Sequence, residues 1–260
     1  MFFPLRDENP TRHRPYVTYA LIAINVLVFV ITRGFEARGH SWMAASYGLV
    51  STRLVADPVG EAFTVVSSMF MHGGWWHLIS NMVFLHIFGD NLEDVLGRRR
   101  YALFYFLSGL VAALLQVATD VASPIPMVGA SGAIAGVIGG YLLLYPRSPV
   151  VVLNTVPLLW LIMPIIAVIP AQWVALEFFI VNGVMALDKL SRAPTSMATG
   201  GVAVFAHLGG FFAGLALIKP LKGAREVEER KWKSFRRGAG APKGGGARWK
   251  RTRRPGDPLD

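Results

Sequence analysis

The 260-residue sequence contains no cysteine and few charged residues. Without cysteine, the chain has no disulfide framework, no thiolate metal site and no thiol nucleophile. Charged residues make up 16% of the chain, whereas hydrophobic residues make up 53%. This balance is too apolar for an ordinary soluble domain. The composition therefore favours a membrane protein.

Excess positive charge is nearly absent outside the C-terminal tail. Residues 1–218 hold 12 Lys and Arg against 11 Asp and Glu, whereas residues 219–260 hold 14 against 5. The tail is rich in Gly, Lys, Arg and Pro and cannot bury a core, so we expect residues 220–260 to be a disordered cytoplasmic tail. Its basic residues fit anionic lipid headgroups, and nucleic acid is not an expected partner.

Six stretches approach the roughly 20 apolar residues that a transmembrane helix needs. They are residues 15–32, 69–89, 101–119, 131–145, 170–187 and 201–218. The proline-rich region 150–169 is predicted to be an apolar loop in the membrane interface, and a second interfacial loop is predicted between the first two spans. We expect an all-α polytopic membrane protein with a cytoplasmic N-terminal segment (1–14), a six-helix membrane domain (15–219) and the basic tail.

Loop charge sets the expected orientation. Six spans place 21 Lys and Arg on the cytoplasmic side and 5 on the outer side. A seventh span would export the basic tail, against the positive-inside rule. The first apolar run lacks a small-residue cleavage signal, which favours a retained span. Both termini are therefore expected in the cytoplasm, and the short soluble regions without a transit peptide suit a bacterial plasma membrane.

A serine and a histidine interrupt two of the apolar stretches. Nucleophilic and ionisable groups inside membrane helices are costly and are functional candidates. Ser131 begins the fourth span, His207 lies six residues into the sixth, and His77 and Asn81 lie early in the second. With six spans, these three helices run from outside to inside. At about 1.5 Å per residue, Ser131 and His207 lie roughly 24 Å and 18 Å from the basic residues that end their helices, so both fall in the outer half of the bilayer.

Small residues would let the fourth and sixth spans approach closely. Glycines recur there every four residues, at Gly132, Gly136, Gly140, Gly210 and Gly214. Such faces often serve only helix packing. Here they lie beside Ser131 and His207, whose short side chains need close helices to reach hydrogen-bond distance.

The sequence resembles the rhomboid family of intramembrane serine proteases over residues 70–217. The resemblance rests on HGGWWHLISN (72–81), FGDNLED (88–94), GASG (129–132) and AHLGGFFAG (206–214). It implies that Ser131 is the nucleophile and His207 its general base, in a dyad without a carboxylate. It also implies that His77 and Asn81, with the Ser131 backbone N–H, stabilise the oxyanion. The physical logic agrees, because a lone serine needs an adjacent base and the oxyanion needs directed donors.

Two positions depart from the family pattern. Many rhomboids have a Trp-Arg pair in the loop before the second helix, where this chain has Phe63 and Thr64. Some have a tyrosine packed on the catalytic histidine, where this chain has Ala135. What anchors the loop and what holds the His207 ring are left open, with Phe205, Phe211 or a neighbouring helix as candidates for the ring.

Other polar residues have weaker claims to function. His86 is expected to be structural, and His72 is expected to brace the outer loop. Glu177 lies inside the fifth span, which makes it a functional candidate, although we expect it instead to be protonated or paired with a helix-end group. The histidines of the second span lack zinc-ligand spacing, so neither a metal nor another cofactor is expected.

The resemblance implies a protease that cuts single-span membrane proteins, which enter sideways between the second and fifth helices. Because a membrane helix hides its carbonyls in its own hydrogen bonds, substrates are expected to carry helix-weakening residues near the cut. A non-catalytic rhomboid-like protein that escorts membrane clients is the alternative. A transporter is disfavoured, because no internal repeat or pair of broken helices is visible.

Overall fold

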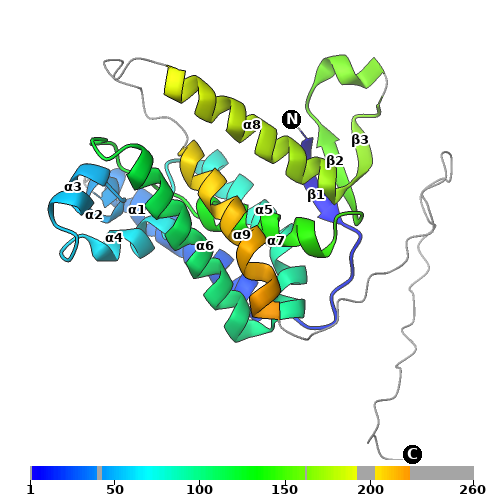
Figure 1. Ribbon diagram of the computed structural model, residues 1–260, viewed down its shortest axis with the longest axis horizontal. Helices are drawn as coiled ribbons and strands as arrows, with labels where there is room; N and C mark the ends of the chain where they lie inside the picture. The colour runs from blue at the N-terminus through cyan, green and yellow to red at the C-terminus, as the bar shows by residue number, and fades with distance from the viewer. Residues whose placement is uncertain (1, 40–42, 162, 192–202, 223–260) are drawn as a thin grey trace, which may run out of the picture. The chain divides into compact units, whose positions relative to one another are not determined.

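The computed structural model describes residues 2–39, 43–161, 163–191 and 203–222. In this part, six helices have 14 residues or more (Figure 1): α1 (Tyr16–Glu36), α5 (Trp75–Leu96), α6 (Arg98–Thr119), α7 (Ser131–Leu144), α8 (Ala171–Ser191) and α9 (Val204–Lys222). Each of them overlaps one of the six predicted spans. The predicted tail lies outside the described residues beyond Lys222.

Three of these helices, α1, α6 and α9, are long and apolar enough to cross a membrane, and α7 is apolar but shorter. Helix α9 packs mainly on α7 and α6, and α5 packs on α1 and α7. Large side chains that are fully buried fill the space between α5, α6 and α7, among them Phe88, Phe104 and Tyr141. The described chain is a mostly helical membrane protein.

Helix α5 begins and ends later than the predicted span 69–89. Residues Ser68–Phe70 form a separate 3-10 turn, η1, and the extended Gly74 precedes the first helical residue, Trp75. The helix then continues to Gly97, whose φ of +74° favours glycine. The acidic stretch 90–94, which lies beyond the predicted span, is therefore helical.

The acidic stretch remains helical because its carboxylates have partners. Glu93 is buried and accepts hydrogen bonds from the backbone N–H groups of Val17 and Thr18, at 2.9 and 2.8 Å. These N–H groups belong to the first turn of α1 and have no partner within that helix. Glu93 thus joins α5 to the beginning of α1.

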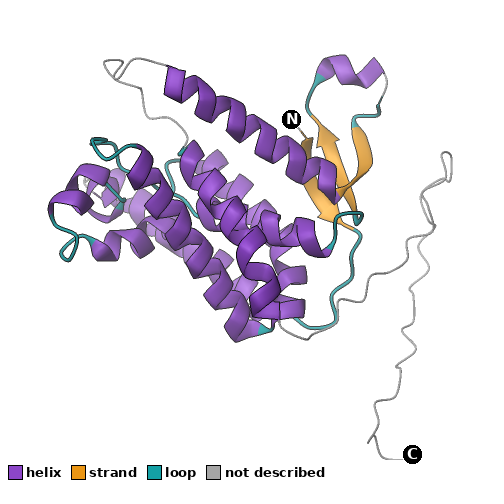
Figure 2. Cartoon of the chain, in the orientation of Figure 1, coloured by secondary structure: helices purple, strands orange, loops and turns teal. Residues whose placement is uncertain are grey.

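A three-stranded antiparallel sheet corrects the all-α expectation (Figure 2). Its strands are β1 (Phe2–Asp7), β2 (Pro149–Asn154) and β3 (Ile166–Pro170), in the order β1-β2-β3. The predicted interfacial loop 150–169 is thus a β-hairpin with a short 3-10 turn, η2 (Pro157–Leu161), between its strands. Prolines exclude a helix there, and the β-branched run Val150–Val152 favours a strand.

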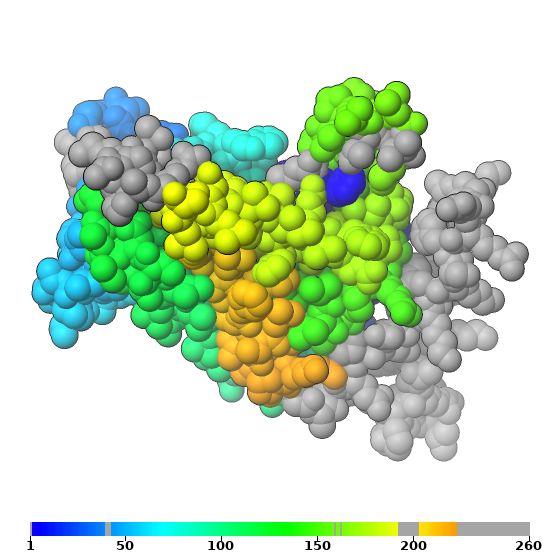
Figure 3. Space-filling view, turned by 45° about the horizontal axis from the view of Figure 1, so that its top comes forward, coloured from blue at the N-terminus to red at the C-terminus, as the bar shows by residue number. Residues whose placement is uncertain are grey.

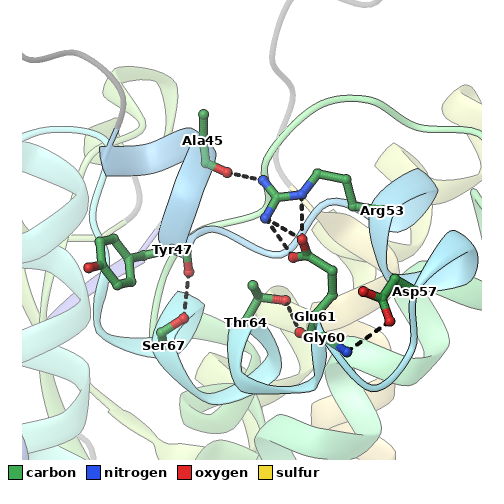
Figure 4. Close-up of polar contacts among 8 residues, drawn as sticks. All are labelled: Ala45, Tyr47, Arg53, Asp57, Gly60, Glu61, Thr64 and Ser67. Atoms are coloured by element: carbon green, nitrogen blue, oxygen red, sulfur yellow. Dashed lines mark hydrogen bonds and ion pairs between the residues drawn. The ribbon is translucent and has the colours of Figure 1, made fainter.

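Short helices fill the segment between α1 and α5. They are α2 (Met43–Tyr47), α3 (Ser51–Ala56) and α4 (Ala62–Ser67). Arg53 holds this segment together, with its Nε and Nη2 donating to the Glu61 carboxylate at 2.9 and 2.6 Å and its Nη1 donating to the Ala45 carbonyl (Figure 4). This pair anchors the segment in which the family's Trp-Arg pair is replaced. Of the two replacing residues, Thr64 is buried and Phe63 is half exposed.

Candidate active site

Ser131 is the first residue of α7, at the point where a tight backbone turn meets the helix. The turn requires glycine at position 129, where φ is +128° and a Cβ would lie 2.8 Å from the His77 ring. Gly129 is held in place by its N–H, which donates to the Ser68 carbonyl at 2.9 Å. The helix begins only after this turn, so the N–H groups of its first turn, including that of Ser131, are left without helical partners.

The structure brings Ser131 and His207 into direct contact. Ser131 Oγ lies 2.7 Å from His207 Nε2, although the two residues belong to α7 and α9. His207 is buried and Ser131 is partly buried. The contact is a short hydrogen bond between a hydroxyl and an imidazole, which is the geometry that activates a serine.

Glycines bring the two helices this close. A Cβ on Gly210 or Gly214 would collide with the carbonyl oxygen of Gly132 or Gly136, respectively, so the backbones themselves are in contact. The third predicted glycine, Gly140, differs. It packs mainly on Leu92 of α5 and Phe104 of α6, whereas Gly139 meets the α9 backbone at Phe211.

Asn182 of α8 holds the far side of the histidine ring, and the sequence analysis did not identify it. Its Oδ1 lies 2.7 Å from His207 Nδ1, and its Nδ2 donates to the Phe178 carbonyl at 2.8 Å. Because Nδ2 is used in this way, Oδ1 accepts a hydrogen bond from the Nδ1–H of His207. His207 Nε2 is therefore the unprotonated nitrogen that accepts from Ser131. The only signal in the sequence was an amide side chain in the middle of an apolar stretch.

Phe178 also packs on the His207 ring, with centroids 5.8 Å apart at an angle of 41°. Some family members have a tyrosine at the position of Ala135 that packs on the histidine, and in this chain Phe178 makes that contact instead. Of the three expected candidates, a neighbouring helix is the one that holds the ring, and Phe211 packs instead on Phe178 at 6.3 Å. The third, Phe205, lies beneath the Lys189 ammonium. The helix that positions the imidazole is thus α8 and not α9 itself.

His77 and Asn81 lie on one face of α5, next to the serine. The His77 ring lies against Gly129, two residues before Ser131. The Gly73 N–H points at His77 Nδ1 at 3.5 Å, which leaves Nε2 to carry the ring proton. Asn81 is buried, and its Nδ2 has no hydrogen-bond partner among the described residues. Both side chains therefore offer unused donors beside Ser131.

These four residues line one cavity of about 600 Å³. Its remaining walls include the start of α5 with Trp76, the middle of α5 with Phe84, and α8 with Phe178. A space of this size is typical of a ligand site. It is large enough to hold water together with several residues of a peptide.

The remaining candidates lie apart from the Ser131–His207 contact. His86 is exposed and stacks on Tyr19 at 6.2 Å. His72 is buried and packs edge-on against His77 at 5.1 Å. Glu177 accepts hydrogen bonds from the Phe2 N–H at 3.0 and 2.8 Å. Among the described residues, no group of three or more His, Cys, Asp or Glu is arranged to hold a metal ion.

Comparison with known proteins agrees with this architecture. The family model of the Rhomboid domain matches residues 59–222, more than half of the chain. Similar curated proteins are RHOMBOID-like protein 5 of Arabidopsis thaliana (38% identical over 36% of this chain), Rhomboid protein 1, mitochondrial, of Saccharomyces cerevisiae (27% over 78%) and Rhomboid protease GluP of Bacillus subtilis (30% over 50%). The matches cover 30%, 52% and 24% of those proteins, respectively.

A bundle of apolar helices with a serine and a histidine in contact at a cavity defines the class, a polytopic membrane protein. The chain belongs to the rhomboid family. That family includes proteins named as proteases and others named only as rhomboid-like.

Proposed function

We propose that the protein is an intramembrane serine endopeptidase with six membrane-spanning helices, α1 and α5–α9. The observation that carries this proposal is the 2.7 Å contact between Ser131 Oγ and His207 Nε2. Ser131 attacks the scissile carbonyl carbon while His207 Nε2 takes the hydroxyl proton. The imidazolium then gives that proton to the leaving amine, and water releases the acyl group by the same route.

The oxyanion of the tetrahedral intermediate is stabilised by three donors. The Ser131 N–H lies at the positive end of α7. Asn81 Nδ2, which has no partner in the described part of the chain, and the His77 Nε2–H face the same cavity. Each such donor typically contributes about 3 to 4 kcal/mol to transition-state stabilisation. No step needs a metal or a cofactor.

The substrates are single-span membrane proteins with a helix that unwinds easily near the cut. Peptide carbonyls in an intact helix are bonded internally and cannot reach Ser131. Six spans place the catalytic cavity toward the outer face and the basic tail in the cytoplasm. The host membrane is a bacterial plasma membrane, which the short soluble regions of the chain fit, and one of the similar proteins is bacterial.

The test uses the full chain purified in detergent with a fluorogenic transmembrane substrate. Ser131→Ala and His207→Ala should each abolish cleavage, while Ser108→Ala and His86→Ala should retain it. Ser108 is a matched control, because it is also a serine facing a close helix contact and its hydroxyl has no partner among the described residues. Cleavage by Ser131→Ala would refute the proposal.

A fluorophosphonate probe gives an independent readout of the serine. It should label the wild-type protein and His86→Ala but not Ser131→Ala. A wild-type protein that neither cleaves nor reacts with the probe would favour a non-catalytic protein that binds membrane clients.

A further inference from the structure

The segment 2–13 follows one face of α5 from its beginning to its end. The Phe3 ring stacks on Trp76 at 5.8 Å and meets Phe84 edge-on at 6.1 Å. Further along, Asn91 bonds to the side chains of Asp7 and Asn9, and Asp94 accepts from the N–H groups of Arg12 and His13. With about 3.6 residues per turn, positions 76, 84, 91 and 94 fall within an arc of about 80°. The segment 2–13 thus covers a continuous stripe of α5, and strand β1 covers the part of it from Trp76 to Asn91.

The other side of β1 meets α8. The Phe2 N–H donates to both oxygens of Glu177, and β1 contacts both α5 and α8. Figure 3 shows the dark blue beginning of the chain between α8 and the light green β2–β3 hairpin. Trp76, Phe84 and Phe178, the neighbour of Glu177, line the catalytic cavity. Strand β1 therefore backs the wall of the cavity between α5 and α8.

Strand β1 is the weaker edge of the sheet. Its register with β2 shifts between Pro4 and Arg6, and Pro4 has no N–H to donate. Strands β2 and β3, in contrast, pair without interruption over five residues. Of the two outer strands, β1 is thus the one that separates more easily.

Helix α8 is poorly suited to move aside, because Asn182 and Phe178 hold the His207 ring. Displacing α8 would remove both contacts from the imidazole. The hydrogen bonds and ring contacts of β1 involve neither Ser131 nor His207. A path that opens by release of β1 leaves the paired serine and histidine intact.

We infer that the surface covered by β1, made of the α5 stripe and the edge of β2, binds an extended apolar segment of the substrate after β1 has left it. The inference rests on the proposed proteolytic function and adds the surface that receives the substrate. Release of β1 alone would expose unpaired backbone groups of β2, which is costly in an apolar environment. A substrate segment unwound for cleavage has equally unpaired groups, so strand addition satisfies both partners. The apolar Phe2-Phe3-Pro4-Leu5 sequence of β1 indicates the kind of segment that fits.

A disulfide between β1 and β2 tests this exchange, since the native chain has no cysteine. Phe3 and Leu153 are paired across the two strands. The Phe3→Cys/Leu153→Cys protein should cleave a transmembrane substrate when reduced and at least tenfold more slowly when oxidised. Fluorophosphonate labelling of Ser131 should be equal in both states, because the probe comes from solvent. Each single-cysteine variant should cleave the substrate at the same rate in oxidant as in reductant.

Phe3→Ala provides a test in the opposite direction. Loss of the ring contacts with Trp76 and Phe84 weakens the hold of β1, so the rate of transmembrane-substrate cleavage should rise severalfold.

Undiminished cleavage by the oxidised double-cysteine variant would overturn the inference. Loss of both cleavage and fluorophosphonate labelling in that oxidised variant would overturn it as well. A wild-type protein without cleavage or labelling would instead refute the proposed function.

Discussion

At the scale of single residues, Asn182 is the side chain that orients the imidazole. We expect Asn182→Leu to lower kcat by about fivefold with little change in KM, because one buried hydrogen bond is worth about 1 kcal/mol. Initial rates over a range of substrate concentrations, measured in detergent, provide the check.

Asn25 is a matched control for this substitution. It is buried in α1 and its Nδ2 bonds to the carbonyl four residues earlier, at 2.8 Å, as that of Asn182 does. Asn25→Leu should leave kcat unchanged. Equal losses in the two variants would mean that Asn182 acts only through helix packing.

The two side chains of α5 that are proposed to stabilise the oxyanion should each be needed for full activity. His77→Ala or Asn81→Ala should lower kcat by about 10²- to 10³-fold, the usual effect of removing one donor. His86→Ala, on the exposed face of the same helix, should have no such effect. Turnover assays together with thermal unfolding separate a catalytic loss from a folding defect, and unaltered turnover in both variants would remove the two residues from the site.

At the scale of helices, the contact between α7 and α9 decides whether the site forms. Gly210→Ala forces the two backbones apart, which we expect to cost about 1 to 3 kcal/mol of stability and most of the activity. Gly183→Ala in α8 is the control, because nothing lies within 4 Å of its added Cβ. That change should stabilise the helix by about 0.5 to 1 kcal/mol. Thermal unfolding and cleavage assays report both effects, and equal behaviour of the variants would contradict the close-contact argument.

Strand β1 gives the fold a pH dependence. Burial raises the pKa of Asp7 from 3.8 to about 7, against the opposing hydrogen bonds from Tyr141 and Asn91. A raised carboxyl pKa means that the folded state favours the protonated form. The stability that Asp7 contributes is full at acidic pH, below its ordinary pKa, and is lost as the pH rises through about 7.

Asp7→Asn removes this titration and keeps the hydrogen-bond acceptor. The variant should unfold a few degrees above wild type at pH 8, with a smaller difference at pH 5. Thermal unfolding in detergent at the two pH values provides the measurement. A difference that is the same at both values would show that Asp7 does not titrate in this range.

At the scale of the whole molecule, the lengths of the apolar runs and the proline positions were enough to predict the six long helices approximately, because each of them is defined by local sequence. The Ser131–His207 contact was also foreseeable, since glycines of two separate helices lie beside these residues. The role of Asn182 and the pairing of β1 could not be predicted from the sequence. Their partners lie 25 and more than 140 residues away in the chain, and nothing in the local sequence specifies such pairings. Residues 150–169 were predicted as a loop, because prolines exclude a helix without indicating a strand partner.

The anchoring of the segment after β1 affects how inhibitors would act. The N–H groups of Arg12 and His13 fix this segment to Asp94, and only four residues separate Asp7 from Arg12. A detached strand on so short a tether stays at an effective concentration on the order of millimolar. A peptide mimetic that binds the edge of β2 therefore competes with the tethered strand β1, and its apparent affinity is lower than its intrinsic affinity for that edge. Small electrophiles that approach Ser131 from water avoid this competition.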